Sequence, residues 1–361
     1  MQIGIVGLPF SGKTTLFQAV TRTLLDQVAL ARQEAHVGVV KVPDRRLGTL
    51  AAMFLPKSVV HATIEFVDVV GLKPGESGST QFSTQFLSKV RTNDALVQVV
   101  RLFADETVPH PDGSIDPLRD IAAFETEFIL SDLALLEGRI ERINKQLQKG
   151  GDEQGKKELP LLERCQRLLE QEQPLREAEF SAEERTVLRN YQFLSLKPML
   201  IALNLHEHQQ ASAESFLQEI RTAKQGRQTA VLSFCGRVDM EIAQLSDEEV
   251  DAFMVEYGMT ELALHLLIRE SYSLLGLQSF FTVGEDECRA WTIRKGMTAQ
   301  EAAGVIHSDF FAKFIRAEAV GYDEFVGLGG SFAKAKEAGL WRLEGKDYIV
   351  KDGDILSIRH S

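Results

Sequence analysis

A glycine-rich segment near the amino terminus has the residue types best suited to holding phosphate groups. It reads Gly7-Leu-Pro-Phe-Ser-Gly-Lys13-Thr-Thr15, after an apolar stretch and before an amphipathic one. Glycines let backbone N–H groups close around phosphates, while Lys13 reaches the β- and γ-phosphates and Thr14 can ligate Mg²⁺. The pattern predicts a nucleoside triphosphate site in which Lys13 also takes part in catalysis. Its expected contact residues are Gly7, Phe10, Ser11, Gly12, Lys13, Thr14 and Thr15.

A second segment, Glu65-Phe-Val-Asp-Val-Val-Gly-Leu72, has the residues that would sense the γ-phosphate. Asp68 ends an apolar run and can hold the Mg²⁺ shell, so Thr14 and Asp68 form the expected metal site. The Gly71 N–H can meet the γ-phosphate. GTPases of the Ras type usually place a water-orienting glutamine directly after this glycine, but Leu72 stands there in this chain. Either another group orients the water, or hydrolysis is slow.

A third segment follows a later apolar run and reads Asn204-Leu-His-Glu207. Many GTPases carry Asn-Lys-x-Asp at this place to recognise guanine. Glu207 is one methylene longer than aspartate, and Leu205 replaces the lysine stem, so guanine should be poorly discriminated. The site can instead receive adenine through backbone groups, with Asn204 supporting the phosphate loop and Leu205 packing on the base. The alternative is a polar turn at the end of a strand.

These segments need a parallel sheet to bring them together. Apolar runs predict strands at 3–6, 37–42, 62–68, 95–103, 198–204 and 229–234. Helical passages separate most of them, so we expect an α/β fold with helices on the sheet faces. The last two strands lie far downstream, which indicates an insertion of about residues 121–196.

The insertion has a helical pattern. Its apolar residues recur in steps of three and four from Ile129 to Leu147, and a second helical stretch follows the break at Gly150-Gly151. We expect an antiparallel hairpin that projects from the sheet domain, the alternative being two helices packed on it. The segment from Ser181 to Glu184 is a capping-box helix start. Helical patterns at 239–257 and 260–275 precede a small α+β domain from residue 277, with strands at 279–282, 289–293, 347–350 and 355–359 and a helix at 298–305.

Composition limits the class of protein. The chain has 361 residues and a formal net charge of −12, which argues against nonspecific coating of nucleic acid. It contains no run of about twenty apolar residues and no secretory signal pattern, so we expect a cytoplasmic protein with no membrane partner. Nothing in the sequence indicates DNA specificity, and we assume a monomer. The three cysteines are widely spaced, which favours reduced thiols over a zinc site.

The chain resembles the YchF/Obg-like ATPase family almost from end to end. This family belongs to the TRAFAC class and to the hydrophobic-substituted relatives of GTPases. The order and spacing of several stretches carry the resemblance. Those stretches are 39–47, 62–72, 204–207, 280–285, 289–293, 303–309 and 344–348.

The resemblance implies a Mg²⁺-dependent, ribosome-binding ATPase with three parts. A Ras-like P-loop domain of the Obg type is expected at 1–120 and 197–276, a helical coiled-coil arm at 121–196, and a TGS-like domain with a β-grasp fold at 277–361. A histidine after the fourth strand is the family's proposed replacement for the missing glutamine, and His110 takes that position here. It would polarise the attacking water; the alternative is a solvated loop residue. The pair that binds the base ring corresponds to Cys235 and Gly236.

Some residues depart from the family pattern. Phe10-Ser11 replaces Asn-Val in the phosphate loop, which places stimulation by potassium in doubt. Arg32 lies where relatives have a threonine that senses Mg²⁺; it either contacts a phosphate or faces solvent. We therefore expect a divergent paralogue that binds nucleotide securely and hydrolyses it slowly.

Three functions are compatible with these residues. The first is a switch that binds and slowly hydrolyses ATP, and possesses some capacity for GTP, in association with the ribosome or ribosomal RNA. The second is a regulatory GTPase that prefers guanine, and the third is a nucleotide-sensing scaffold with negligible hydrolysis. Partner surfaces are expected on the TGS-like domain and on the arm, where Arg139, Arg142, Lys145 and Lys149 can attract RNA or simply form a solvated helix face.

Overall fold

The computed structural model describes residues 1–26, 35–69, 82–224, 226, 228–256 and 261–361. Contacts divide the chain into two compact units. The first comprises Met1–Gly38 and Glu65–Leu267, and the second comprises Val39–Ile64 and Ile268–Ser361. The described strands form two six-stranded sheets.

The first sheet has the strand order β2-β4-β1-β5-β6-β7. Its strands are β1 (Gln2–Gly7), β2 (His36–Lys41), β4 (Thr63–Asp68), β5 (Ala95–Arg101), β6 (Met199–Asn204) and β7 (Thr229–Phe234). Strand β1 pairs in parallel with both β4 and β5, and β5, β6 and β7 continue the parallel arrangement. Every residue of β5 and β6 is buried, as expected for strands covered on both faces. The predicted α/β fold is confirmed.

Parallel pairing brings the functional segments to one edge of this sheet. Asp68 pairs with Ile5, and Asn204 pairs with Arg101, so both lie at carboxyl ends of strands beside the phosphate loop. Strand β1 lies between β4 and β5, and the chain adds later strands on both sides of it. Ligands of open α/β sheets bind at such a reversal of strand order.

Helices cover the sheet and fix its position by hydrophobic packing. The first unit contains α1 (Lys13–Thr21), α4 (Thr84–Arg91), α8 (Ala213–Ala223), α9 (Gly236–Ile242) and α10 (Asp247–Glu256). Helix α11 (Ala263–Leu274) begins in the first unit and ends in the second. Phe86 of α4 and Ile220 of α8 share one buried cluster with Leu96 of β5 and Met199 of β6. Val6 of β1 belongs to the same cluster, so the strand that leads into the phosphate loop is held by this hydrophobic core.

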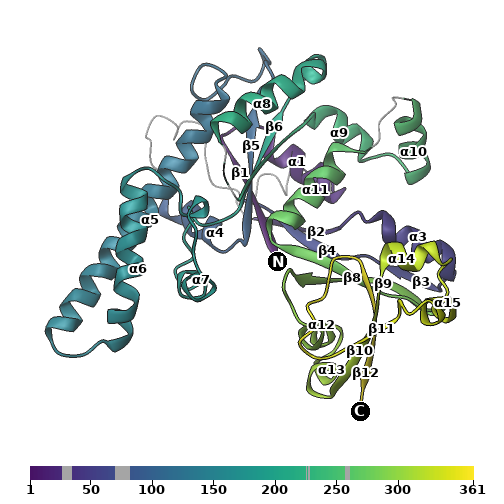
Figure 1. Ribbon diagram of the computed structural model, residues 1–361. Helices are drawn as coiled ribbons and strands as arrows, with labels where there is room; N and C mark the ends of the chain where they lie inside the picture. Colours follow the sequence, from purple (N-terminus) through teal and green to yellow (C-terminus); the bar gives the residue numbers. More distant parts are fainter. Residues whose placement is uncertain (27–34, 70–81, 225, 227, 257–260) are drawn as a thin grey trace. The chain divides into compact units, whose positions relative to one another are not determined.

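The inserted arm is a hairpin of two long helices, α5 (Pro117–Gln148) and α6 (Glu153–Glu170), which run side by side in Figure 1. Asp116 and Asp152 cap their first turns by accepting hydrogen bonds from backbone N–H groups. The two helices share a core of their own, and its buried members on them are Ile129, Leu136, Ile143, Leu162, Cys165 and Leu169. The predicted hairpin is confirmed, although α5 begins at Pro117, four residues before the expected boundary.

The chain returns from the arm through α7 (Ala182–Arg189). Ser181 accepts a hydrogen bond from the Glu184 N–H, and the Glu184 carboxylate accepts one from the Ser181 N–H. This is the capping box predicted from the sequence.

The second unit contains the other sheet, with the order β11-β10-β12-β8-β9-β3. Its strands are β3 (Ser58–Val60), β8 (Leu277–Thr282), β9 (Glu287–Arg294), β10 (Phe314–Gly321), β11 (Arg342–Glu344) and β12 (Asp354–His360). Its helices are α3 (Arg45–Phe54), α12 (Ala299–Ile306), α13 (Ser308–Ala312), α14 (Tyr322–Gly327) and α15 (Phe332–Glu337).

Two sequence predictions about this unit differ from the structure. Residues 347–350 do not form a strand and make only an isolated bridge between Ile349 and Thr298. Strand β10 was not predicted because its alanines at 317 and 319 give no alternation of large apolar residues. Both errors have the same cause, because strands are predicted from alternating large apolar residues. The short aromatic stretch at 347–350 has such residues without forming a strand, and the alanine-rich strand β10 lacks them.

The segment 39–64 also groups differently from the predicted domain boundaries. It falls in the second unit because β3 pairs in parallel with β9 and because Phe54 stacks on Phe325. The sequence prediction places this segment in the nucleotide-binding domain because its two ends, at 37–42 and 62–68, have the pattern of strands of that sheet.

Candidate functional site

The phosphate loop connects β1 to α1, and its backbone conformation requires glycine at two positions. Gly12 has φ of 97° and immediately precedes α1, and Phe10 has φ of 63°. A Cβ on Gly12 would lie 2.2 Å from Asn204 Nδ2, and one on Gly7 would lie 2.5 Å from the Val99 carbonyl oxygen. Both glycines are therefore required by close contacts. The loop presents the N-terminal end of a nine-residue helix, which favours an anion.

Lys13 is the cation of this loop. Its Nζ donates a hydrogen bond to the Leu8 carbonyl oxygen at 2.7 Å. Burial lowers the pKa of Lys13 to about 8, although the charge of Asp68 acts in the opposite direction. A bound phosphate would favour the ammonium form and raise this pKa.

The affinity for ATP should therefore fall as the pH rises above about 8. Below that value Lys13 is already charged in the free protein, so binding needs no additional proton. Above it, binding must take up a proton, and the affinity should weaken by up to about tenfold per pH unit. Titration calorimetry between pH 7.5 and 9.5 measures this slope. A Lys13→Arg variant stays charged and should lose the slope; a slope that persists there would contradict the assignment to Lys13.

Thr14 and Asp68 meet as predicted for a metal site. The Thr14 hydroxyl donates to Asp68 Oδ2 at 2.9 Å. Burial raises the pKa of Asp68, while the Thr14 hydrogen bond and the charge of Lys13 oppose the shift. A hydroxyl and a carboxylate oxygen are ligands that suit Mg²⁺. Among the described residues there is no cluster of three or more histidine, cysteine, aspartate or glutamate side chains that could hold a metal ion by themselves. A metal here would therefore depend on phosphate oxygens and water for its other ligands.

Asn204 links the phosphate loop to the expected base pocket. Its Nδ2 donates to the Ser11 carbonyl oxygen at 3.0 Å, and its Oδ1 accepts from the Gly236 N–H at 3.0 Å. Gly236 begins α9, and Asp239 in the first turn of that helix accepts from the Cys235 N–H at 3.0 Å. Burial raises the pKa of Asp239 to about 6. The two ends of the predicted site are thus joined through one buried side chain.

Other predicted base-pocket residues differ in their exposure. Leu205 is only 3% exposed and packs in the same buried cluster as β5 and β6. Cys235 is also buried. Glu207 is exposed and its Oε1 lies 3.6 Å from Arg237 Nε, which is a weak surface ion pair. The roles of these residues toward a base remain predictions.

The His110 side chain is buried and lines a narrow space together with Leu8 and Ser11 of the phosphate loop. Its Nε2 lies 3.0 Å from Asp120 Oδ2, and its Nδ1 accepts from the Asp112 N–H at 3.2 Å. Burial raises the pKa of Asp120, an effect opposed by Arg119 and His110. The alternative of a solvated histidine is excluded in this conformation, since the His110 side chain is 4% exposed. Both ring nitrogens are engaged, so His110 would have to leave Asp120 before acting on water.

Two residues near this site were not predicted. Asp120, at the start of α5, is the partner of His110, and nothing in the sequence connects residues ten positions apart. Arg101 ends the buried strand β5 and is 3% exposed. The sequence does contain a sign of the role of Arg101, because a buried cation at the end of an otherwise apolar strand needs a partner. Gly71, Leu72 and Arg32 lie outside the described residues.

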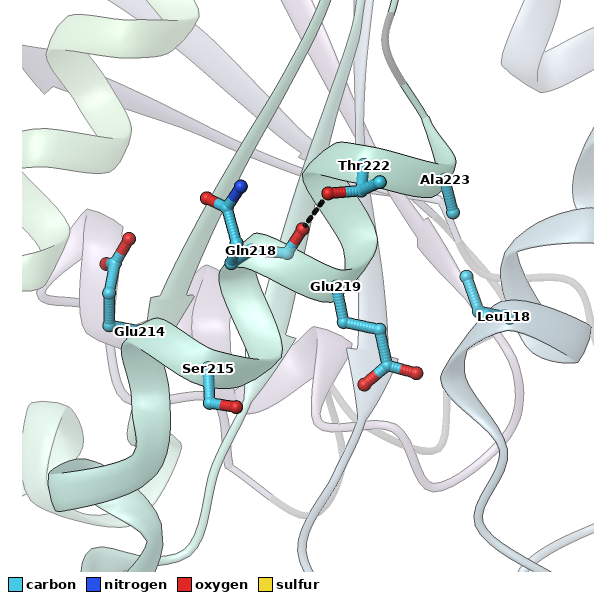
Figure 2. A pocket seen from close by; sticks show the side chains of 7 residues that line it. All are labelled: Leu118, Glu214, Ser215, Gln218, Glu219, Thr222 and Ala223. Carbon is cyan, nitrogen blue, oxygen red and sulfur yellow. Dashed lines mark hydrogen bonds between the residues drawn. The ribbon is translucent and has the colours of Figure 1, made fainter.

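A hollow of about 630 Å³ lies elsewhere on the first unit. It is lined by Leu118 and by one face of α8 (Figure 2). Glu214 and Glu219 line it, and the Thr222 hydroxyl is used within the helix, where it donates to the Gln218 carbonyl oxygen. Two carboxylates disfavour a phosphate, so this hollow is a poor candidate for holding a nucleotide.

The arrangement defines a class of protein. A parallel sheet, a glycine loop that opens a helix, and Thr14, Asp68 and Asn204 at the same sheet edge are the parts of a P-loop nucleoside triphosphatase related to GTPases.

Comparison with known proteins places the chain within this class. Residues 2–132 match a family described as 50S ribosome-binding GTPase, and residues 277–361 match the YchF-GTPase C-terminal family, described as a protein of unknown function. The chain is 41% identical over 360 residues to the ribosome-binding ATPase YchF of Bacillus subtilis strain 168, covering 99% of this chain and 98% of that protein. It is 42% identical over 358 residues to the ribosome-binding ATPase YchF of Escherichia coli O157:H7, covering 98% and 97%.

A solved structure agrees with the sequence relatives. The Schizosaccharomyces pombe YchF GTPase has a TM-score of 0.86 and 30% identity, and the match covers 99% of this chain and 97% of that one. The chain belongs to the YchF family, as the sequence resemblance implied.

Proposed function

We propose that this protein is a nucleotide-dependent switch that binds ATP, hydrolyses it slowly and associates with the ribosome. The observation that carries the proposal is the continuous link from the phosphate loop through Asn204 to Gly236, in a chain related over its full length to ribosome-binding ATPases. Glu207 at the place of the guanine-reading aspartate supports adenine.

Mg²⁺ would be held by Thr14 and Asp68 together with the phosphates. When bound, it neutralises charge that develops on the phosphates during their transfer. Lys13 contributes a second positive charge, and the N–H groups of the loop orient the phosphates. Release of His110 from Asp120 would let its ring polarise the attacking water.

The cytoplasm is the expected location. None of the described helices combines the length and the apolar character that crossing a bilayer requires.

In the arm, Arg139 is paired with Glu158 and Lys145 with Glu141, whereas no carboxylate pairs with Arg142 or Lys149 in the described part of the chain. These two cations are therefore the better candidates among the four for contacting ribosomal RNA.

Ribosome co-sedimentation tests the switch. We expect the bound fraction to differ between a nonhydrolysable ATP analogue, ADP and no nucleotide. An identical bound fraction in all three conditions would contradict it. Dissociation constants for ATP and GTP test the base preference, and a preference for GTP above about tenfold, or about 1.4 kcal/mol, would favour the regulatory GTPase instead.

His110→Ala should lower the turnover number for ATP at least tenfold because the polarising ring is lost. The dissociation constant for ATP should change by less than about threefold, since His110 is not one of the residues of the phosphate loop. His208→Ala, an exposed histidine of the same unit, is the matched control. Unchanged turnover in His110→Ala would remove His110 from the mechanism, and negligible turnover of the unmodified protein would favour the scaffold.

A further inference from the structure

Arg101 holds the segment that carries His110. Its Nε donates to the Phe103 carbonyl oxygen at 3.0 Å, and its Nη2 donates to the Val108 carbonyl oxygen at 2.7 Å. Its guanidinium carbon lies 4.4 Å from the centre of the Phe103 ring. One buried side chain thus contacts the beginning and the end of the connection between β5 and His110.

The third nitrogen of this guanidinium, Nη1, has no hydrogen-bond partner among the described residues. Arg101 Nη1, Gln98 Oε1 and Ser11 Oγ are buried, and within the described residues none of these atoms has a hydrogen-bond partner. Their residues line one narrow space together with Leu8, His110 and Asp120, and this space has no room for a water molecule. This space lies between the phosphate loop, β5 and the first turn of α5.

The chemistry of the three atoms is complementary. Gln98 Oε1 accepts hydrogen bonds, Arg101 Nη1 donates them, and the Ser11 hydroxyl does both. Buried polar atoms are nearly always paired in folded proteins, so three unpaired ones around one space mark a place where a second arrangement is favourable. In such an arrangement the Ser11 hydroxyl and Arg101 Nη1 would both donate to Gln98 Oε1.

We propose that Arg101 is the positioning residue of His110, and that Ser11 and Gln98 connect its position to the state of the phosphate loop. The proposal rests on the catalytic role proposed for His110. Nucleotide binding changes the loop at Ser11, Gln98 passes the change along β5 to Arg101, and Arg101 moves Val108 and with it His110. Arg101 contacts the Val108 carbonyl oxygen directly, and Ser11, Gln98 and Arg101 line the same narrow space.

A double-mutant cycle on the full-length protein tests the proposal. Arg101→Met, which keeps the volume and removes the hydrogen bonds, should lower the turnover number about tenfold and leave the dissociation constant for ATP within twofold. In the His110→Ala background the same change should cost less than twofold, because Arg101 acts through His110. Arg101→Lys keeps the charge and one donor group, and should recover part of the loss.

Controls separate positioning from folding. Arg221→Met removes another arginine that donates to a backbone carbonyl oxygen, that of Val231, and should leave turnover unchanged. If Arg101→Met does not fold, Gln98→Leu decides: it should lower turnover without changing ATP affinity.

Three results would overturn the proposal. They are full turnover in Arg101→Met or, where that variant does not fold, in Gln98→Leu; equal losses from Arg101→Met with and without His110; and a loss confined to ATP affinity. Failure of the proposed catalytic role is seen separately, as full turnover in His110→Ala alone.

Discussion

Replacement of Lys13 by methionine is expected to weaken ATP binding about 1000-fold. Methionine keeps most of the side-chain volume but removes the only lysine of the phosphate loop, and loss of one partner of a desolvated charge pair costs about 4 kcal/mol. In the free protein the change should be mild, because within the described residues the hydrogen bond to the Leu8 carbonyl oxygen is the one that the Lys13 side chain makes. Burial already lowers the pKa of Lys13.

Equilibrium binding of a fluorescent ATP analogue measures this loss, and thermal unfolding without nucleotide checks the fold. Lys145→Met in the arm is a matched control and should bind ATP normally. ATP affinity within tenfold of the unmodified protein in Lys13→Met would mean that the nucleotide does not bind at this loop.

Asn204→Ala is expected to lower the free energy of unfolding by about 3 kcal/mol and to weaken ATP binding at least tenfold. The change removes both hydrogen bonds of the side chain and leaves the buried Ser11 carbonyl and Gly236 N–H without their partner, at about 1–3 kcal/mol each. The loss of binding follows because the conformation of Ser11 and Gly12 is no longer held.

Urea unfolding and ATP titration of the same preparations measure the two effects. Asn190→Ala, an exposed asparagine at the end of α7, is the control and should change neither. Normal stability of Asn204→Ala would show that the link between loop and base pocket carries little energy.

Most of the first sheet could be predicted from the sequence because its strands are buried on both faces. Runs such as those at 95–101 and 199–204 are almost continuously apolar, and their glycine-rich or polar ends mark where they stop. The arm was equally visible, since heptad-like spacing over a long segment has few other interpretations. The contact of Thr14 with Asp68 could also be predicted, because each follows a buried strand of the same parallel sheet in a recognisable motif.

The rest could not be predicted because it depends on contacts between distant residues. Strand β3 is three residues long and exists only because β9 lies beside it. The contact of His110 with Asp120 depends on where α5 begins, which the sequence placed four residues late. The alignment with β9 that assigns 39–64 to the second unit is likewise a property of the folded chain.

The length of helix α5 links the surroundings of His110 to the far end of the arm. Asp120, the partner of His110, lies in its first turn, and the helix then continues without a described break to Gln148 at the end of the arm. At about 1.5 Å per residue the distance between them is about 42 Å. A tilt of about 5° at Asp120 would displace the far end by about 4 Å, because α6 packs along α5 and stiffens it. One end of α5 therefore carries Asp120, the partner of His110, for which a catalytic role is proposed, and the other end lies at the tip of the arm.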